Sequence, residues 1–230
     1  MTDNIKETNK PIMELKDVFY TYTTKYVKVE AVRGVSYTFE KGKFYAIQGA
    51  SGSGKTTLLS IMAGLDYATK GNVLFEGVEL TNIDTSKYRR ENVSVIYQNF
   101  NLLPQLTVAE NVMYPMELMG IKPSEARKRA IEYIKLVGLT EEEFVRFPAT
   151  LSGGQQQRVA IARALGTTAK VILADEPTGN LDKENTRIVI DILQELAHDK
   201  GYCVIVVTHD VTVADSADVK LLMEDGKLIV

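Results

Sequence analysis

Cysteine and tryptophan are nearly absent from this 230-residue sequence, which has one cysteine and no tryptophan. A single cysteine excludes any disulfide within the chain, and with it the small disulfide-stapled scaffolds. Cys203 lies in the apolar run CVIVV (203–207), so we expect a small buried hydrophobe rather than a reactive thiol. The fold must therefore rest on a hydrophobic core, and a chain of this length with 45% hydrophobic residues can form one.

Long hydrophobic runs are also missing. No apolar stretch approaches the roughly 18 residues needed to cross a bilayer. The N-terminus, MTDNIKETNKP, is polar and lacks the apolar core of a secretory signal. We expect residues 1–11 to be a disordered tail, because they have little to bury. A role at a membrane would then depend on a partner that holds the chain there.

Positive charge shows no excess. The sequence has 27 Lys and Arg against 30 Asp and Glu, a formal net charge of −3. Proteins that bind nucleic acid usually carry a basic excess or a basic patch. The most basic stretch, EARKRA (125–130), has the pattern of a solvated helix face. We therefore expect no nucleic acid among the partners.

Short apolar strands alternate with helical patterns over most of the chain. KFYAI, VSVIY, VILAD and CVIVV are apolar at nearly every position, which is typical of strands covered on both faces. Helical patterns between them predict an α/β fold with a parallel sheet and right-handed crossovers. We expect one domain over residues 12–230, with a core of about 12–98 and 159–230 and an inserted helical lobe of about 99–158.

The predicted lobe contains a clear helical pattern. Within PSEARKRAIEYIKLVGL, the apolar residues at helical spacing form one stripe, which ends before Gly138: Ala126, Ala130, Ile134 and Val137. Thr140 and Glu143 then match a capping box and predict a short following helix.

The stretch GASGSGKT, Gly49 to Thr56, matches G-x-x-x-x-G-K-[ST] and lies between a predicted strand and a predicted helix. Its glycines let consecutive N–H groups turn toward an anion, and the helix start adds favourable partial charge. Lys55 can reach the β- and γ-phosphates, and Thr56 offers a hydroxyl to Mg²⁺. The sequence thus predicts a site for ATP and Mg²⁺, made by Gly49, Ser51, Gly52, Ser53, Gly54, Lys55, Thr56 and Thr57.

The segment VILADE predicts a second part of the same site. Its four apolar residues form a strand whose C-terminal end carries Asp175 and Glu176. Ligands of open α/β sheets bind at this edge. We expect Asp175 to hold Mg²⁺, directly or through water, and Glu176 to polarise the water that attacks the γ-phosphate.

LSGGQ, Leu151 to Gln155, is the most specific segment. Ser152 and Gln155 fit a capping box, which is a purely structural explanation for two of its residues. That explanation leaves out Gly153 and Gly154, because glycine destabilises a helix. Exposed N–H groups at a helix start form an anion site, so we expect a second phosphate-binding surface here.

Over residues 12–230 the sequence resembles the ATP-binding-cassette (ABC) ATPases. The resemblance rests on the phosphate loop, Gln98, LSGGQ, VILADE, NLD at Asn180 to Asp182 and THD at Thr208 to Asp210, in the family's order. It implies a P-loop (RecA-like) nucleotide-binding core with a mostly parallel sheet, an antiparallel β subdomain and an inserted helical lobe. It also implies an ATPase.

The resemblance assigns roles to further residues. Tyr22 matches the aromatic residue that stacks on adenine, with Tyr20 as the weaker candidate. Gln98 matches the glutamine that senses Mg²⁺ and the attacking water. His209 matches the histidine that orients the γ-phosphate, whereas His198 is expected to be structural. Lys55 and Glu176 complete the implied catalytic set.

The family further implies a homodimer that forms on ATP binding. Each ATP then lies between the phosphate loop of one chain and the LSGGQ of the other. The residues implied to serve the partner's nucleotide are Ser152, Gly153, Gly154, Gln155 and Asp182. We expect two half-sites in each chain.

Two segments, EPTGNLD (176–182) and QNFNLLPQLTVAENV (98–112), resemble one branch of the family. That branch contains the ATPases of macrolide exporters, lipoprotein-release systems and antimicrobial-peptide exporters. It implies an integral-membrane permease partner and a cytoplasmic location, peripheral on the inner face of the membrane. FNLLPQLTV (100–108) is where such proteins contact the membrane subunit, with packing of the helical lobe as the alternative.

Other functions stay open at this point. A cassette coupled to a cell-division or cell-wall regulatory membrane protein shares the GNLD pattern. A soluble ABC ATPase outside transport is a second alternative. An ordinary phosphate-loop kinase is a third, although kinases lack LSGGQ and would need a site for an acceptor substrate.

Overall fold

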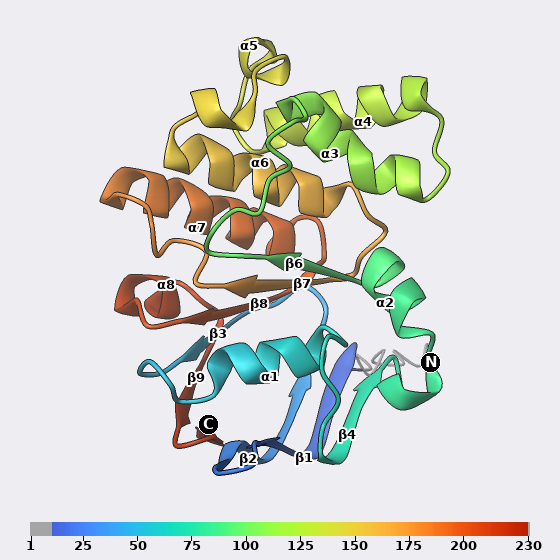
Figure 1. The fold of residues 1–230 in the computed structure, drawn as a ribbon. Coiled ribbons are helices and arrows are strands. Elements are labelled where there is room, and N and C mark those ends of the chain that lie inside the picture. Colours follow the sequence, from blue (N-terminus) through green and yellow to red (C-terminus); the bar gives the residue numbers. More distant parts are fainter. Residues whose placement is uncertain (1–10, 230) are drawn as a thin grey trace, which may run out of the picture.

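The computed structural model describes residues 11–229. Residues 1–10 of the predicted disordered tail, and residue 230, lie outside the described part. The described chain forms two sheets and two groups of helices, arranged in layers (Figure 1). The predicted α/β fold is confirmed.

The smaller sheet is antiparallel and has the strand order β2-β1-β4-β5. Its strands are β1 (Met13–Thr23), β2 (Lys28–Phe39), β4 (Lys70–Phe75) and β5 (Val78–Glu79). Alternate residues of β1, among them Met13 and Leu15, are buried, as expected for a sheet with one covered face. This sheet is the antiparallel β subdomain that the sequence predicts.

The larger sheet has the order β10-β9-β3-β8-β7-β6 and is parallel except for β10. Its strands are β3 (Phe44–Gln48), β6 (Val93–Ile96), β7 (Val171–Asp175), β8 (Cys203–Thr208), β9 (Val219–Glu224) and β10 (Lys227–Ile229). Because β3, β7 and β8 are neighbours and run in one direction, the residues that follow them meet at one edge. That edge positions the candidate site.

The helices lie on both faces of this sheet. They are α1 (Lys55–Met62), α2 (Thr85–Glu91), α3 (Val108–Leu118), α4 (Pro123–Leu136), α5 (Glu141–Phe144), α6 (Gly153–Leu165), α7 (Lys183–His198) and α8 (Val211–Asp215), with 3-10 turns at Leu80–Asn82 and Pro148–Thr150. Helices α6 and α7 lie between the sheet and α3, α4 and α5, whereas α1 lies between the sheets (Figure 1). In the described chain, no helix combines the length and the apolar character needed to span a membrane.

Two hydrophobic cores lie on opposite faces of the larger sheet. Along β7, Val171 and Leu173 belong to the core shared with α1 and the antiparallel sheet. Ile172 and Ala174 belong to the core shared with the helices on the other face. This alternation explains why the strand is apolar from Val171 to Ala174.

The helical lobe shares its core with the sheet. The apolar stripe predicted for this helix is buried, with Ala126, Ala130 and Val137 at 0% exposure. Gly138 follows the end of α4 with φ 70°, a left-handed value typical of glycine. Helix α6 is continuous through residue 158, where the sequence predicts the lobe to end. The division into core and lobe therefore stays a prediction.

Candidate functional site

The loop between β3 and α1 leaves the start of α1 open. Gly54 is the N-cap, with φ 106°, and no side chain caps the helix or places an acid in its first turn. A Cβ at Gly54 would lie 2.2 Å from the carbonyl oxygen of Ala31. Only glycine fits this backbone and this contact. The first N–H groups of α1 thus remain available to an anion.

Lys55 lies inside this loop and is 6% exposed. Its ammonium donates to the carbonyl oxygen of Gly49 at 2.8 Å and to that of Ala50 at 3.0 Å. Among residues 11–229, no carboxylate forms an ion pair with it at contact distance. Since an ammonium has three donors, one is left for a phosphate oxygen.

Thr56 and Asp175 meet across the site. The Thr56 hydroxyl donates to Oδ1 of Asp175 at 3.2 Å. Burial raises the pKa of Asp175, the nearby Glu176 carboxylate raises it further, and Thr56 and Lys55 act in the opposite direction. A bound cation would favour the ionised carboxylate.

The donor chemistry here fits Mg²⁺. In the described residues, no cluster of three or more His, Cys, Asp or Glu side chains could hold a metal ion. Mg²⁺ is commonly held by one or two protein oxygens together with substrate phosphates and water. A hydroxyl at Thr56, a carboxylate at Asp175 and the amide of Gln98 in the same pocket satisfy this pattern.

Glu176 follows β7 in a strained conformation, with φ 47°. Its carboxylate accepts the Thr208 hydroxyl at 3.2 Å and the His209 N–H at 3.3 Å, and it lies 2.9 Å from Nδ1 of His209. The pairing of β7 with β8 brings these groups together. The structure therefore fixes Glu176 beside His209, as a base and its neighbour would need to be.

Most residues predicted for the nucleotide line one pocket of about 760 Å³. It is bounded by Tyr22, Ser51, Gly52, Gly54, Lys55, Thr56, Thr57, Gln98, Asp175, Glu176 and His209. Gly49 and Ser53 belong to the loop but do not line this pocket. The predicted residues thus come from β1, the phosphate loop, the start of α1 and the C-terminal ends of β6, β7 and β8 or the residues just after them.

Tyr22 is the better placed of the two candidate tyrosines. Its side chain lines the pocket, is 46% exposed and shares a hydrogen bond of 3.2 Å with Thr57. Tyr20 instead donates to Asp66 at 3.3 Å and packs edge-on against Tyr22, with ring centroids 4.8 Å apart. Tyr22 therefore has the open aromatic surface that an adenine could cover.

LSGGQ forms the start of α6. Ser152 accepts from the Gln155 N–H at 3.3 Å, and Gln155 accepts from the Ser152 N–H at 2.9 Å, so the predicted capping box is present. Gly153 and Gly154 occupy the first two helical positions, whose N–H groups have no acceptor within the helix. These two N–H groups are the ones that could bind an anion.

Packing against α7 also favours glycine at position 154. A Cβ there would lie 2.0 Å from Oδ1 of Asn185, at the start of α7. The side chain of Asn185 is bonded to both carboxylate oxygens of Asp182, the N-cap of α7, at 3.0 Å. The hydrogen bonds from Asn185 lower the pKa of Asp182. The starts of α6 and α7 are therefore packed together.

The structure separates the two predicted halves of the site. Ser152, Gly153, Gly154, Gln155 and Asp182 do not line the nucleotide pocket of their own chain. The residues that line it without having been predicted include Val29, Glu30, Ala31 and Arg33 of β2 and Asp225 and Gly226 after β9. They carry no local motif, because tertiary packing alone brings them to the loop.

The sequence is similar to a known family and to several known proteins. Residues 32–179 match the family described as ABC transporter. The macrolide export ATP-binding/permease protein MacB of Shigella flexneri is 43% identical over 222 residues, which cover 95% of this chain and 34% of MacB. The methionine import ATP-binding protein MetN of Bacillus subtilis is 40% identical over 221 residues, which cover 95% of this chain and 64% of MetN.

Solved structures of the bacterial ABC transporter cassette MJ0796 are also similar. One is a dimeric structure, and another is a dimeric post-hydrolysis state bound to ADP and Pi. Each superposes with a TM-score of 0.87 at 38% identity and covers 95% of this chain and 97% of the cassette. The similarity therefore extends over almost the whole of both chains.

Proposed function

Because this chain belongs to the ABC transporter family, we propose that it is the ATPase subunit of a membrane transporter for export or for release of an extracytoplasmic substrate. As a member of that family it is an ATP-binding cassette that hydrolyses ATP. The observation that carries the proposal is the single pocket that gathers Lys55, Gln98, Asp175, Glu176 and His209.

The phosphates of ATP lie on the loop before α1. Backbone N–H groups and the third donor of Lys55 bind their oxygens. Thr56, Asp175 and Gln98 would hold Mg²⁺, which would neutralise part of the negative charge of the phosphate oxygens. Tyr22 stacks on the adenine ring. These contacts position the γ-phosphate at the edge where Glu176 and His209 lie.

Glu176 accepts a proton from the attacking water. The water oxygen bonds to the γ-phosphorus while the bond from that phosphorus to the bridging oxygen of ADP breaks. A carboxylate offers about four lone-pair positions, and hydrogen bonds from the Thr208 hydroxyl and the His209 backbone N–H occupy two of them, both on one oxygen. The carboxylate therefore keeps room to accept from the water. His209 orients the γ-phosphate beside it.

Two copies of the chain pair head to tail when ATP binds. Ser152, Gly153, Gly154, Gln155 and Asp182 then serve the nucleotide held by the other copy. Their absence from the pocket of their own chain supports this arrangement, as does the dimer formed by the related cassette MJ0796.

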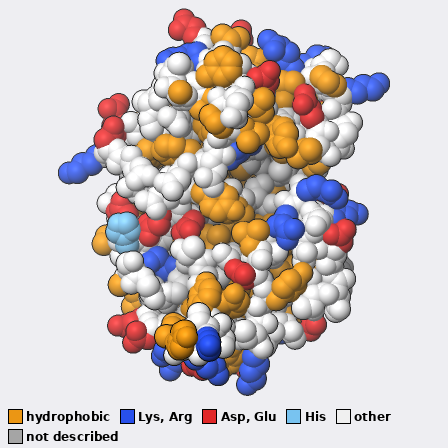
Figure 2. Space-filling model, viewed as in Figure 1, with side chains coloured by type: hydrophobic (Ala, Val, Ile, Leu, Met, Phe, Trp, Pro, Cys, Tyr) orange, Lys and Arg blue, Asp and Glu red, His pale blue; other side chains and the backbone are white. Residues whose placement is uncertain are grey.

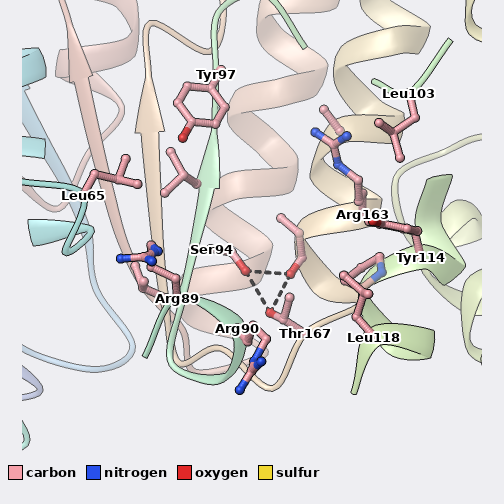
Figure 3. A pocket seen from close by; sticks show the side chains of 15 residues that line it. Leu65, Arg89, Arg90, Ser94, Tyr97, Leu103, Tyr114, Leu118, Arg163 and Thr167 are labelled. Atoms are coloured by element: carbon pink, nitrogen blue, oxygen red, sulfur yellow. Dashed lines mark hydrogen bonds between the residues drawn. The ribbon is translucent and has the colours of Figure 1, made fainter. Parts of the chain in front are cut away.

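A second pocket, of about 380 Å³, receives the membrane partner; we call it the docking pocket. Figure 3 shows Leu65, Arg89 and Arg90 across from Arg163, Tyr114 and Leu118. Hydrophobic side chains gather near the middle of this face, with Lys and Arg beside them (Figure 2). A short helix of an integral-membrane permease, apolar with an acidic residue facing Arg89 or Arg90, fits this lining.

Only part of FNLLPQLTV faces the docking pocket. Leu103 lines it, whereas Val108 is buried in the core of the lobe. The segment thus combines packing with contact to a partner. With the partner bound there, the proposed location is the inner face of the membrane, on its cytoplasmic side, as the resemblance to the export branch implies.

The export assignment rests on the EPTGNLD and QNFNLLPQLTVAENV segments. MacB, a macrolide exporter by its name, and MetN, a methionine importer by its name, are 43% and 40% identical to this chain. Overall sequence identity to these relatives therefore does little to distinguish export from import. Substrate specificity belongs to the membrane partner.

A phosphate-release assay on the purified chain tests the proposed ATP site. The wild type is expected to release phosphate from ATP only with Mg²⁺. Glu176→Gln is expected to lower the rate roughly 100-fold or more while ATP binding is retained, and Lys55→Ala to weaken ATP binding itself. Wild-type turnover in Glu176→Gln would show that another group is the base.

Co-expression with the membrane protein encoded beside this chain tests the transport role. A partner with a few membrane helices and a large extracytoplasmic domain, bound through the docking pocket, would support export or release. A many-helix permease working with a solute-binding protein would overturn that assignment and leave the ATPase assignment intact.

A further inference from the structure

The backbone directly after Gln98 is strained. Phe100 and Asn101 both have left-handed φ values, 57° and 49°. A non-glycine residue seldom adopts this conformation, a bulky one least of all, and it persists only where the surrounding structure holds it. The turn's own bond, from the Phe100 N–H to the Tyr97 carbonyl at 3.2 Å, closes it without attaching it to the rest of the fold.

Arg163 makes that attachment. From the last turn of α6, its Nη1 donates to the Asn101 carbonyl at 2.6 Å and its Nη2 to the Phe100 carbonyl at 3.0 Å. The planar fork of a guanidinium fits two neighbouring acceptors in this way. Within residues 11–229, Arg163 forms no ion pair with a carboxylate, and burial lowers the pKa of its guanidinium.

The loop after β7 holds the other end of the same segment. The Asn180 side-chain amide donates to the Gln98 carbonyl at 3.3 Å. A Cβ at Gly179 would lie 2.7 Å from Nε2 of Gln98, so the Gln98 side chain rests against the backbone there. Asn180 thus holds the carbonyl of Gln98 itself, and Arg163 holds the turn that follows it.

We propose that Arg163 is a positioning residue for ATP hydrolysis, which holds the Phe100–Asn101 turn and thereby keeps Gln98 at the Mg²⁺ and the attacking water. This role rests on the ATP site proposed above. Arg163 itself does not line the nucleotide pocket but lines the docking pocket, where Figure 3 shows it beside Leu103. It acts on the reaction only through the backbone that it holds.

Arg163→Met tests this role, because it keeps the length of the side chain and removes both donors. We expect kcat to fall roughly 10- to 100-fold, the cost of a misplaced reacting group, with the Kd for ATP changed less than about twofold. The Mg²⁺ concentration for half-maximal activity should rise as it does in Gln98→Ala. Arg163→Lys keeps the positive charge but loses the planar pair of donors. Its kcat should lie between those of the wild type and Arg163→Met.

A double-mutant cycle separates positioning from general destabilisation. In Arg163→Met/Gln98→Ala, kcat should be no lower than in Gln98→Ala alone, because Arg163 acts only by positioning the Gln98 side chain, which is already absent. Arg158 provides the control, since it lies on α6 and donates to the carbonyl oxygens of Gly138 at 2.8 Å and Val137 at 3.4 Å. The effect of Arg158→Met should add to that of Gln98→Ala and leave the Mg²⁺ requirement unchanged.

Full additivity of Arg163→Met with Gln98→Ala, or a wild-type kcat and Mg²⁺ requirement in Arg163→Met, would overturn the proposal. If Arg163→Met fails to bind ATP, Arg163→Lys decides, and a wild-type Mg²⁺ requirement in that variant contradicts the role. A wild-type chain without ATP hydrolysis would instead contradict the proposed function. The two failures are therefore distinguishable.

Discussion

The starts of α1 and α6 offer the same backbone groups but are completed in opposite ways. At α1 the N-cap is Gly54, which has no side chain to accept a hydrogen bond. At α6, Ser152 and Gln155 complete a capping box. The first helix therefore keeps its N–H groups for a phosphate, whereas the second satisfies part of its own end. In the proposed function, the loop at α1 binds the phosphates of its own chain's ATP, and the start of α6 adds to the ATP held by the other chain.

The capping box is not what makes the start of α6 a candidate site. The same box, from Thr107 and Glu110, begins α3, and another, from Thr140 and Glu143, begins α5. Neither of those helices has glycine in its first turn. Gly153 and Gly154 distinguish α6, because they weaken the helix and allow a phosphate and a neighbouring helix to come close.

Substituting one glycine in each half gives the largest expected difference. In Gly54→Ala the new Cβ meets the backbone of Ala31 at a positive φ, a strain of about 1–3 kcal/mol that corresponds to roughly 5- to 150-fold weaker ATP binding. In Gly154→Ala it meets the side chain of Asn185, which does not line the nucleotide pocket of its own chain. ATP binding should then survive while hydrolysis falls.

Isothermal titration with ATP and a phosphate-release assay, made on both variants, measure this difference. Equal loss of ATP binding in Gly54→Ala and Gly154→Ala would break the comparison, since both glycines would then serve the same nucleotide.

Removing one cap tests whether Ser152 does more than begin a helix. Ser152→Ala should lower the free energy of unfolding by about 1 kcal/mol. Asp84→Ala is the control, because Asp84 caps α2 by accepting the N–H groups of Ser86 and Lys87 and lies outside both halves of the site. Urea unfolding should show similar losses in both variants, whereas hydrolysis should fall in Ser152→Ala alone. If ATP hydrolysis falls equally in Asp84→Ala, the effect of Ser152→Ala comes from loss of stability, and Ser152 acts only as a helix cap.

The smallest expected effect is the pH dependence of stability contributed by Asp175 and Asp182. Its sign differs between these two residues, one from each half of the site. The pKa of Asp175 is raised by burial, so its ionised form costs folding free energy above that pKa and the cost disappears as pH falls to about 4. The pKa of Asp182 is lowered by hydrogen bonds from Asn185, so its stabilising effect is present above about pH 4 and is lost as pH falls through the lowered pKa.

Thermal unfolding of Asp175→Asn and Asp182→Ala over a pH series measures both signs. At neutral pH, Asp175→Asn should be more stable than the wild type and Asp182→Ala less stable, and both differences should shrink in acid. A destabilised Asp175→Asn at neutral pH would show that the buried carboxylate contributes to folding rather than to the binding of a cation.

Local patterns account for what could be predicted. Residues close together in the sequence define three kinds of feature that the structure contains: the phosphate loop, the capping boxes of α5 and α6, and the apolar strands. Helix α3 was missed, although Thr107 and Glu110 mark its start, because Pro115 interrupts its pattern. Strands β9 and β10 were not predicted. Strand β9 pairs with β3, which is far away in the sequence, and β10 pairs with β9 over only three residues.

Long-range contacts account for what could not be predicted. Nothing in the residues near Arg163 indicates that it binds carbonyls 62 and 63 positions away. The left-handed φ of Phe100 is likewise not indicated by its residue type, whereas asparagine, at position 101, adopts this conformation more readily. The packing of Gly154 on Asn185 likewise exists only once α6 and α7 lie together.

The central claim is that the nucleotide pocket and the start of α6 are halves of one site made by two chains. Light scattering on Glu176→Gln, with and without Mg²⁺ and ATP, tests it most directly, because ATP then persists. The account predicts twice the monomer mass of 25.6 kDa with ATP and the monomer mass without it, and a return to the monomer when Gly154→Asp is added. A chain that binds ATP and stays monomeric would contradict it.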